Sequence, residues 1–125
     1  MIHGIGTDIV TIARLGEMIA RHGDRALEKL LAPAEQDACR HHSDPARFLA
    51  KRFAAKEALG KALGTGIRTP VLLPAIEIRH DELGKPLFHF HGELSAFMDR
   101  HGYRCHLSLS DEKEQVIAFA IVETP

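Results

Sequence analysis

The sequence has little of what a membrane, secreted or nucleic-acid-binding protein needs. No apolar run is long enough to span a bilayer, and the opening MIHGIGTDIV lacks the basic segment that precedes the apolar core of an export signal. With no tryptophan and one tyrosine, few side chains could stack on bases. The two cysteines, Cys39 and Cys105, are far apart, as is typical of reduced thiols. We therefore expect a cytoplasmic protein that binds neither membrane nor nucleic acid.

What is present suits one small globular domain. The chain has 125 residues, of which 45% are hydrophobic, enough for a core but with little to spare. No linker, internal repeat or low-complexity stretch divides it. We expect a single domain over residues 1–125.

Periodicity predicts the α+β class, with helices first and then mainly antiparallel strands with one helix between them. The longest helix begins after Ser43 or Asp44 as cap, has Pro45 at its first position and ends at Gly64 and Gly66, about 19 residues in all. The expected strands are 2–10, 75–79, 87–91, 104–110 and 116–122, and the expected helices are 11–23, 25–31, 33–42, 45–63 and 93–102.

Charge is unevenly distributed, although the net charge is only −1. Residues 40–68 carry seven basic and two acidic side chains, so this segment is +5 and the remainder is −6. A basic block in an otherwise acidic chain indicates an anionic ligand. The same block also fits a solvated helix face, and charge alone favours that interpretation.

The long helix, FLAKRFAAKEALGKALGTG, holds one carboxylate, Glu57, among its cations. One interpretation is an exposed helix ion pair with Lys61, four residues later. However, alanines on one side and larger apolar residues on another predict that both flanks are packed, so Glu57 would emerge at a cleft. A carboxylate there, with cations one turn away, favours a divalent metal that bridges to phosphates.

A second carboxylate for such a metal is Asp8. It interrupts a strand of apolar and small residues, beside glycines that would let another backbone approach closely. An unpaired, inward-facing aspartate would be costly. The local pattern fits equally well an aspartate at the strand end that caps the next helix.

The stretch HLSLS puts His106, Ser108 and Ser110 on one face of a strand. Three hydrogen-bonding side chains in a row could line a polar site. They also fit a plain solvent-facing edge, which the strand alone favours.

Four segments together are similar to a known family: GIGTDIVTIARL at 4–15, the long helix at 48–66, GKP at 84–86 and HLSLSDE at 106–112. In order and spacing they resemble the holo-acyl-carrier-protein synthase family, the small, trimeric type of 4′-phosphopantetheinyl transferase. The resemblance runs nearly from end to end. It implies a mainly antiparallel sheet packed with a long central helix, and active sites shared between the subunits of a homotrimer.

The resemblance also implies an activity and its residues. The enzyme would transfer 4′-phosphopantetheine from coenzyme A to a serine of apo-acyl carrier protein, for fatty acid biosynthesis, and release adenosine 3′,5′-bisphosphate. Asp8 and Glu57 would bind Mg²⁺, and Lys61 would contact phosphate as the third catalytic residue. The remaining implied contacts are Arg52, Lys85, Pro86, His106, Ser108 and Ser110 for coenzyme A, and Arg14 and Arg21 for the acidic carrier protein.

One departure limits the resemblance. Some members carry histidine where this chain has Asp111 after Ser110, so a proton-transfer role at that place is not implied. A rival from another class is a non-catalytic module that binds a carrier protein or a nucleotide. It would need the basic segment and the Arg14 face, but would have no use for Asp8 or Glu57.

Overall fold

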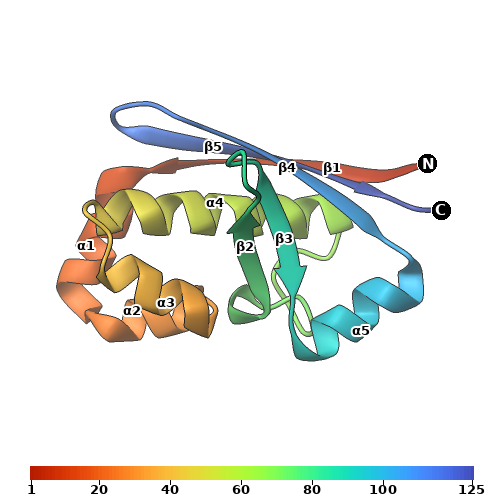
Figure 1. Ribbon diagram of the computed structural model, residues 1–125, viewed down its shortest axis with the longest axis horizontal. Helices are drawn as coiled ribbons and strands as arrows, with labels where there is room; N and C mark the ends of the chain where they lie inside the picture. The colour runs from red at the N-terminus through yellow and green to blue at the C-terminus, as the bar shows by residue number, and fades with distance from the viewer.

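A computed structural model describes all residues, 1–125, and places an antiparallel sheet across one long helix (Figure 1). The three strands of this sheet lie in the order β1-β5-β4, and a separate hairpin pairs β2 with β3. The expected antiparallel arrangement is confirmed. The strands are β1 (Ile2–Thr11), β2 (Ile76–His80), β3 (Pro86–Phe90), β4 (Arg104–Asp111) and β5 (Gln115–Glu123).

Five helices pack around the sheet and the hairpin, and all five were expected from the sequence. The long helix α4 lies under the sheet, α1 to α3 form a group at one end of it, and α5 links the hairpin to β4 (Figure 1). No helix combines the length and the apolar character needed to cross a bilayer. The helices are α1 (Ile12–His22), α2 (Asp24–Leu30), α3 (Pro33–Arg40), α4 (Pro45–Leu63) and α5 (Gly92–His101), with a short 3₁₀ turn at Leu73–Ala75.

Helix α4 begins and ends as its sequence predicts. The carboxylate of Asp44 accepts a hydrogen bond from the Arg47 backbone N–H at 3.2 Å, and Pro45 follows at the first helical position. Gly64 ends the helix with a φ of 82°, a left-handed conformation that favours glycine. Between these ends, the small side chains of the buried alanines let neighbouring elements approach the helix closely.

Two glycines bring β1 directly against α4. A Cβ atom added at Gly4 would fall on the carbonyl oxygen of Ala62, and one added at Gly6 would fall on that of Ala58. Side chains alternate along a strand, so Asp8 faces α4 as Gly6 does. The close approach therefore sets Asp8 against the helix that carries Glu57.

Lys56 corrects the interpretation of residues 40–68 as a solvated basic face. Its side chain is fully buried, and its ammonium donates to Glu35 Oε1 at 2.6 Å and to the carbonyl oxygens of Leu30 and Leu73 at 2.9 and 3.0 Å. Burial lowers the pKa of Lys56, and the Glu35 charge opposes that shift. Most of the other cations pair with distant acids: Arg40 with Asp24, Arg47 and Lys51 with Asp111, and Lys61 with Asp8.

We predict that Gly6→Ala lowers the free energy of unfolding, because the new methyl group would press on the α4 backbone. Overpacking of this kind costs about 1–3 kcal/mol. Gly16→Ala on α1 is the matched control: its Cβ would lie 3.4 Å from the Ala46 Cβ, an ordinary contact, and alanine favours helix. Urea unfolding of both variants would measure the difference. Equal stability of the two would contradict the proposed close approach.

Candidate active site

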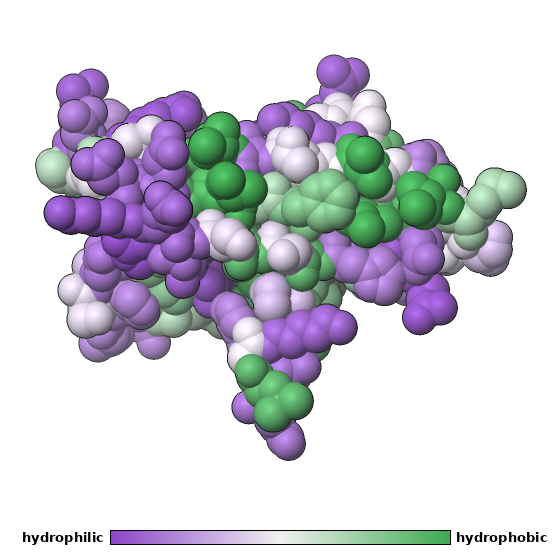
Figure 2. All heavy atoms as spheres, turned by 90° about the horizontal axis from the view of Figure 1, so that it is seen from above, coloured by the Kyte–Doolittle hydropathy of each residue, from purple (hydrophilic) through white to green (hydrophobic).

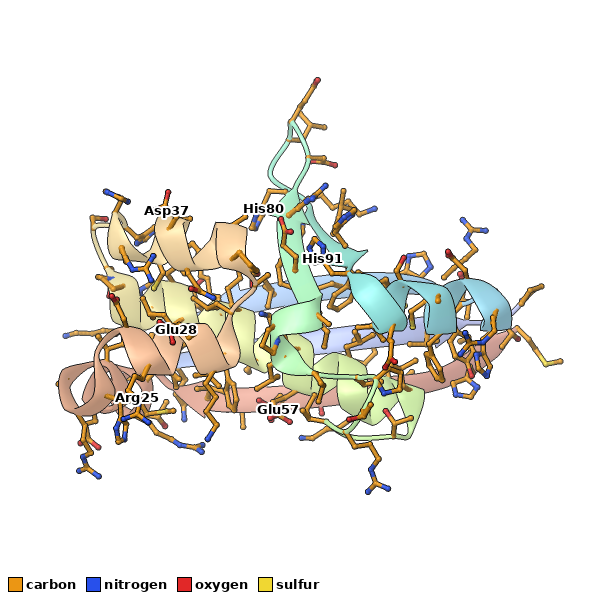
Figure 3. The ribbon with its side chains drawn as sticks, turned by 90° about the horizontal axis from the view of Figure 1, so that it is seen from below. Arg25, Glu28, Asp37, Glu57, His80 and His91 are labelled. Carbon is orange, nitrogen blue, oxygen red and sulfur yellow. The ribbon has the colours of Figure 1, made fainter.

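Two carboxylates from distant parts of the chain meet where β1 crosses α4. Asp8 projects from the inner face of β1, and its side chain is 17% exposed. Glu57 projects from α4, half-buried, and Figure 3 shows it beside the ribbon of β1. The Lys61 ammonium lies between the same two elements, donating to the Thr7 carbonyl oxygen at 2.8 Å and to Asp8 Oδ1 at 3.2 Å. The structure thus brings together the three residues predicted to be catalytic.

The pKa of Glu57 is raised above its ordinary value. Burial is the main cause, and the negative charge of Asp8 adds to it, while Lys61 and Arg14 act in the opposite direction. Mutual repulsion of two carboxylates is relieved when a cation binds between them. Two hard oxygen donors on facing elements also suit Mg²⁺, which takes one or two carboxylates and leaves its other positions to water and phosphate. The residues present therefore fit a magnesium ion.

The two local alternatives for these carboxylates are wrong. Asp8 does not cap the helix that follows it, because the N-cap of α1 is Thr11 and no side chain caps that end. The i,i+4 ion pair between Glu57 and Lys61 does not form either, since Lys61 directs its ammonium to Asp8 instead. Asp8 and Lys61 are thus joined by a tertiary contact between β1 and α4.

The predicted polar strand lies on the other face of the sheet. His106, Ser108 and Ser110 are exposed on β4, and His106 Nε2 lies 2.7 Å from Glu123 Oε2. Across the sheet, Ser110 is opposite Ile117, which is opposite Ile9. Ile9 points away from α4, whereas its neighbour Asp8 points toward it. Within one chain the structure does not bring this polar strand to the two carboxylates.

Arg52 lines a cationic pocket that the sequence did not reveal. The pocket has a volume of about 290 Å³ and lies between α4 and the end of β2. The Arg52 side chain is 12% exposed, and its Nε is 3.4 Å from Glu35 Oε2 without forming a hydrogen bond. Burial, together with the nearby charges of Arg52 and Lys51, lowers the pKa of His80 at the rim. The lining residues are His42, Arg47, Phe48, Lys51, Arg52 and His80.

The predicted Lys85-Pro86 turn lies where the loop between β2 and β3 enters β3. The hairpin of these two strands projects from the body of the protein (Figure 3). Asp81 shapes this turn, because its Oδ1 accepts hydrogen bonds from the backbone N–H groups of Leu83 and Lys85, both at 2.9 Å. Lys85 is exposed and Pro86 half-buried. Their side chains are therefore accessible at the base of a defined turn.

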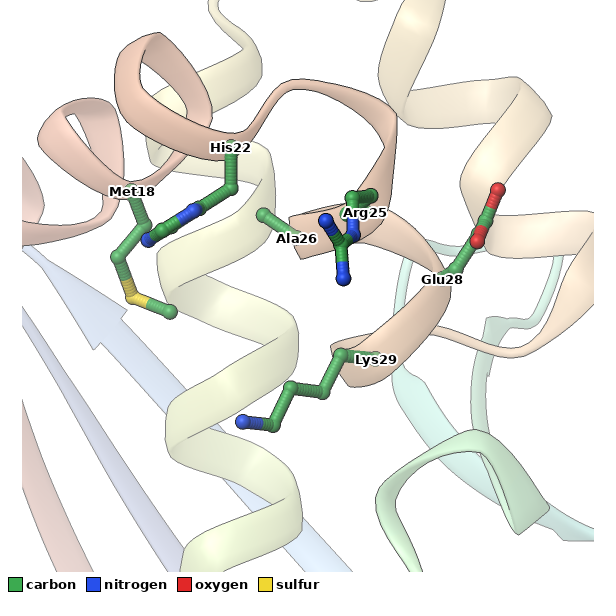
Figure 4. Close-up of a pocket in the computed structure, with 6 residues that line it drawn as sticks. All are labelled: Met18, His22, Arg25, Ala26, Glu28 and Lys29. Atoms are coloured by element: carbon green, nitrogen blue, oxygen red, sulfur yellow. The ribbon is translucent and has the colours of Figure 1, made fainter.

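Arg14 and Arg21 lie on one face of α1, as predicted, and line a common hollow. The Arg14 guanidinium lies 6.0 Å from the centre of the Phe53 ring on α4, one turn before Glu57, and its charge opposes the rise in the pKa of Glu57. A larger cavity of about 610 Å³ continues onto α2, where Arg25 and Lys29 add two cations that the sequence analysis missed (Figure 4). Arg25 and Lys29 are four residues apart on α2 and therefore share one face of it, which was the available signal. This face is therefore more basic than predicted.

Comparison with known proteins decides the family. The sequence profile of the 4′-phosphopantetheinyl transferase superfamily matches residues 4–120. The chain belongs to this superfamily. The expectation that it is an enzyme, a phosphopantetheinyl transferase, is thereby confirmed.

Relatives of this transferase match it over its full length. A holo-[acyl-carrier-protein] synthase of Azoarcus sp. (strain BH72) is 56% identical over 124 residues, which cover 99% of each chain. The crystal structure of the synthase from Neisseria meningitidis is 44% identical, covers 99% of this chain and 100% of its own, and superposes with a TM-score of 0.95. The Helicobacter pylori synthase, solved in complex with coenzyme A, is 32% identical, covers 95% and 99%, and has a TM-score of 0.82. The predicted phosphopantetheinyl transferase-like fold is confirmed.

We predict that Glu57→Gln stabilises this transferase at neutral pH when EDTA removes metal ions. The unfolded glutamate ionises near its ordinary pKa, while the folded one stays protonated to higher pH. The wild type therefore loses stability as pH rises from the ordinary glutamate pKa through the raised one. Because Glu57 is partly exposed, we expect a gain of only about 0.5 kcal/mol at pH 7 and none at pH 4.

Urea unfolding across this pH range would measure the gain. Glu82→Gln, an exposed glutamate in the hairpin turn, is the control and should show no pH-dependent difference from the wild type. A loss of stability for Glu57→Gln at pH 7 would contradict the raised pKa of Glu57.

Proposed function

We propose that the chain transfers the 4′-phosphopantetheine group of coenzyme A to a serine of apo-acyl carrier protein. Its other product would be adenosine 3′,5′-bisphosphate, and the reaction would support fatty acid biosynthesis in the cytoplasm, with residues 1–125 acting as one domain. Relatives named as holo-[acyl-carrier-protein] synthases match its whole length, and one was solved with coenzyme A. The observation that carries the proposal is the pair of carboxylates, Asp8 and Glu57, that meets beside Lys61.

In this proposal Asp8 and Glu57 hold Mg²⁺. When bound, the ion would neutralise charge on the pyrophosphate of coenzyme A. Lys61 is 54% exposed, so its ammonium can turn from Asp8 to a phosphate oxygen. Phosphoryl transfer asks an enzyme chiefly for positioning and for stabilisation of developing negative charge. These three side chains supply both.

Coenzyme A would contact Arg52, Lys85 and Pro86, together with the polar strand of His106, Ser108 and Ser110. In one chain that strand faces away from the two carboxylates. A site that uses both would need the strand of one subunit to face the carboxylates of another. This separation supports the proposed homotrimer with active sites at its interfaces.

The outer face of the sheet supports the same assembly. Figure 2 shows hydrophobic side chains gathered on the face over β1 and β5. Among them Ile5, Ile9 and Ile117 are 61%, 57% and 48% exposed. A contiguous apolar surface of this kind is typical of a protein–protein interface.

The basic face of α1 and α2 is the proposed docking surface for the carrier protein. Arg14 and Arg21, with Arg25 and Lys29 beside them, would attract an acidic partner. Such attraction mainly raises the association rate and weakens with salt. Arg14 also lies near Glu57, so a carrier bound there would be close to the carboxylates.

We predict that Asp8→Ala and Glu57→Ala each lower Mg²⁺-dependent transfer by at least about a hundredfold, because each removes a group that stabilises developing charge. Intact-mass spectrometry of apo-acyl carrier protein, incubated with coenzyme A and Mg²⁺, would measure transfer as the gain of one phosphopantetheine. The control variant Asp99→Ala, at an exposed aspartate on α5, should retain wild-type activity. EDTA should abolish transfer by the wild type and by this variant. A carrier that binds but stays unmodified would favour the non-catalytic module.

We predict that Ile117→Asp dissociates the trimer, because a carboxylate in an apolar interface would be buried without a partner. Sedimentation velocity would measure the change, and transfer should fall with it, since each site would lose the neighbouring strand. Leu83→Asp is the control, because Leu83 is 97% exposed at the hairpin tip, away from the sheet. A monomeric variant with full activity would contradict the shared site.

A further inference from the structure

Asp111 joins the polar strand to the cationic pocket. It is the last residue of β4, directly after Ser110, and its side chain is 30% exposed. Its Oδ2 accepts a hydrogen bond from Arg47 Nη1 at 2.7 Å, and its Oδ1 lies 3.5 Å from Lys51 Nζ. Both cations line the pocket that Arg52 also lines. One carboxylate thus neutralises two of the three permanent cations of the pocket.

We infer that Asp111 is a specificity-determining residue: it is the internal counter-ion of the cationic pocket, and the 3′-phosphate of coenzyme A must compete with it for Arg47 and Lys51. The inference rests on the proposed function, because it takes coenzyme A as the donor. In this inference Asp111 sets the affinity for the 3′-phosphate and takes no part in proton transfer.

The choice of the 3′-phosphate follows from the positions of the cations. Coenzyme A carries a pyrophosphate and one separate phosphate monoester, at the 3′ position. The pyrophosphate is assigned to the carboxylate pair and Lys61. The cationic pocket adjoins Ser110 of the polar strand through Asp111. In the proposed shared site this strand faces the carboxylates of another subunit, so the pocket would lie beside the pyrophosphate as a second phosphate site. A phosphate monoester carries close to two negative charges at pH 7, against one on Asp111.

The contacts of Arg47 and Lys51 show which of the two depends on Asp111 as its acidic partner. Arg47 Nε also donates to Asp44 Oδ2 at 3.2 Å, and its other nitrogens donate to the carbonyl oxygens of Glu112 and Lys113 at 2.8 and 3.1 Å. Arg47 is therefore held in place with or without Asp111. Lys51 has no acidic partner other than Asp111. A variant without the Asp111 charge should therefore keep Arg47 in place, while Lys51 becomes available to a ligand.

The electrostatics of Asp111 agree with this pairing. Desolvation raises its pKa, but the hydrogen bond from Arg47 and the charge of Lys51 outweigh that effect, so the pKa lies below its ordinary value. Asp111 is therefore ionised at neutral pH and opposes a second anion. Weaker binding of the 3′-phosphate would also speed release of adenosine 3′,5′-bisphosphate, which retains that group.

Calorimetric titration of the full-length protein with coenzyme A and with dephospho-coenzyme A, which lacks only the 3′-phosphate, tests the inference. Asp111→Asn should bind coenzyme A roughly fivefold more tightly than the wild type, the coupling of an exposed ion pair, and should bind dephospho-coenzyme A unchanged. Glu112→Gln is the matched control: it removes the same charge one residue later, from a side chain that makes no ion pair, and should change neither affinity.

Lys51→Gln gives a second measurement that does not depend on how Asp111→Asn folds. It should weaken coenzyme A binding severalfold and spare dephospho-coenzyme A. Unchanged or weaker binding of coenzyme A by folded Asp111→Asn, or equal gains for both ligands, would overturn the inference. So would an equal effect of Glu112→Gln. Failure of the wild type to bind coenzyme A would instead overturn the proposed function.

Discussion

The close approach of β1 to α4 is the constraint on which the rest of the structure depends. Gly4 and Gly6 have no side chains where the strand crosses the helix, and the helix offers the backbone of Ala58 and Ala62. Any larger residue at either glycine would separate the two elements. Because the strand alternates, the same register that packs Gly6 against the helix turns Asp8 toward Glu57. The geometry that packs the strand against the helix therefore also positions the site.

Charge along α4 is divided between structure and function by position on the helix. Lys56 is buried with Glu35 and ties α2, α3 and the segment before β2 to the helix. A buried, hydrogen-bonded ion pair of this kind is costly to break by removing one partner. Lys61 remains more than half exposed beside Asp8. Two lysines five residues apart on one helix thus differ in role: Lys56 stabilises the fold, and Lys61 is available to a ligand. Their identical side-chain type does not reveal this difference.

One face of the sheet forms part of the core, and the other face is exposed. Its inner face packs on α4, while its outer face exposes isoleucines on β1 and β5 and a polar row on β4. The carboxylates on one side and the polar row on the other belong to the same catalytic proposal only if subunits share a site. The proposed assembly, in which subunits share a site, would also account for the apolar residues that remain exposed on this face.

The sequence by itself determined the order of the helices and strands, and their limits to within one or two residues, because periodicity, caps and turn glycines act over a few residues. It also indicated Asp8 and Glu57 as two possible ligands of one metal, and the family resemblance added Lys61 as a catalytic residue. Only the tertiary structure decided that Lys56 is buried, that Lys61 pairs with Asp8 rather than Glu57, and that Asp111 neutralises Arg47 and Lys51. Each of these contacts joins residues far apart in the chain. Local pattern carries no information on such pairs, since burial and distance between charges are set by how the elements pack.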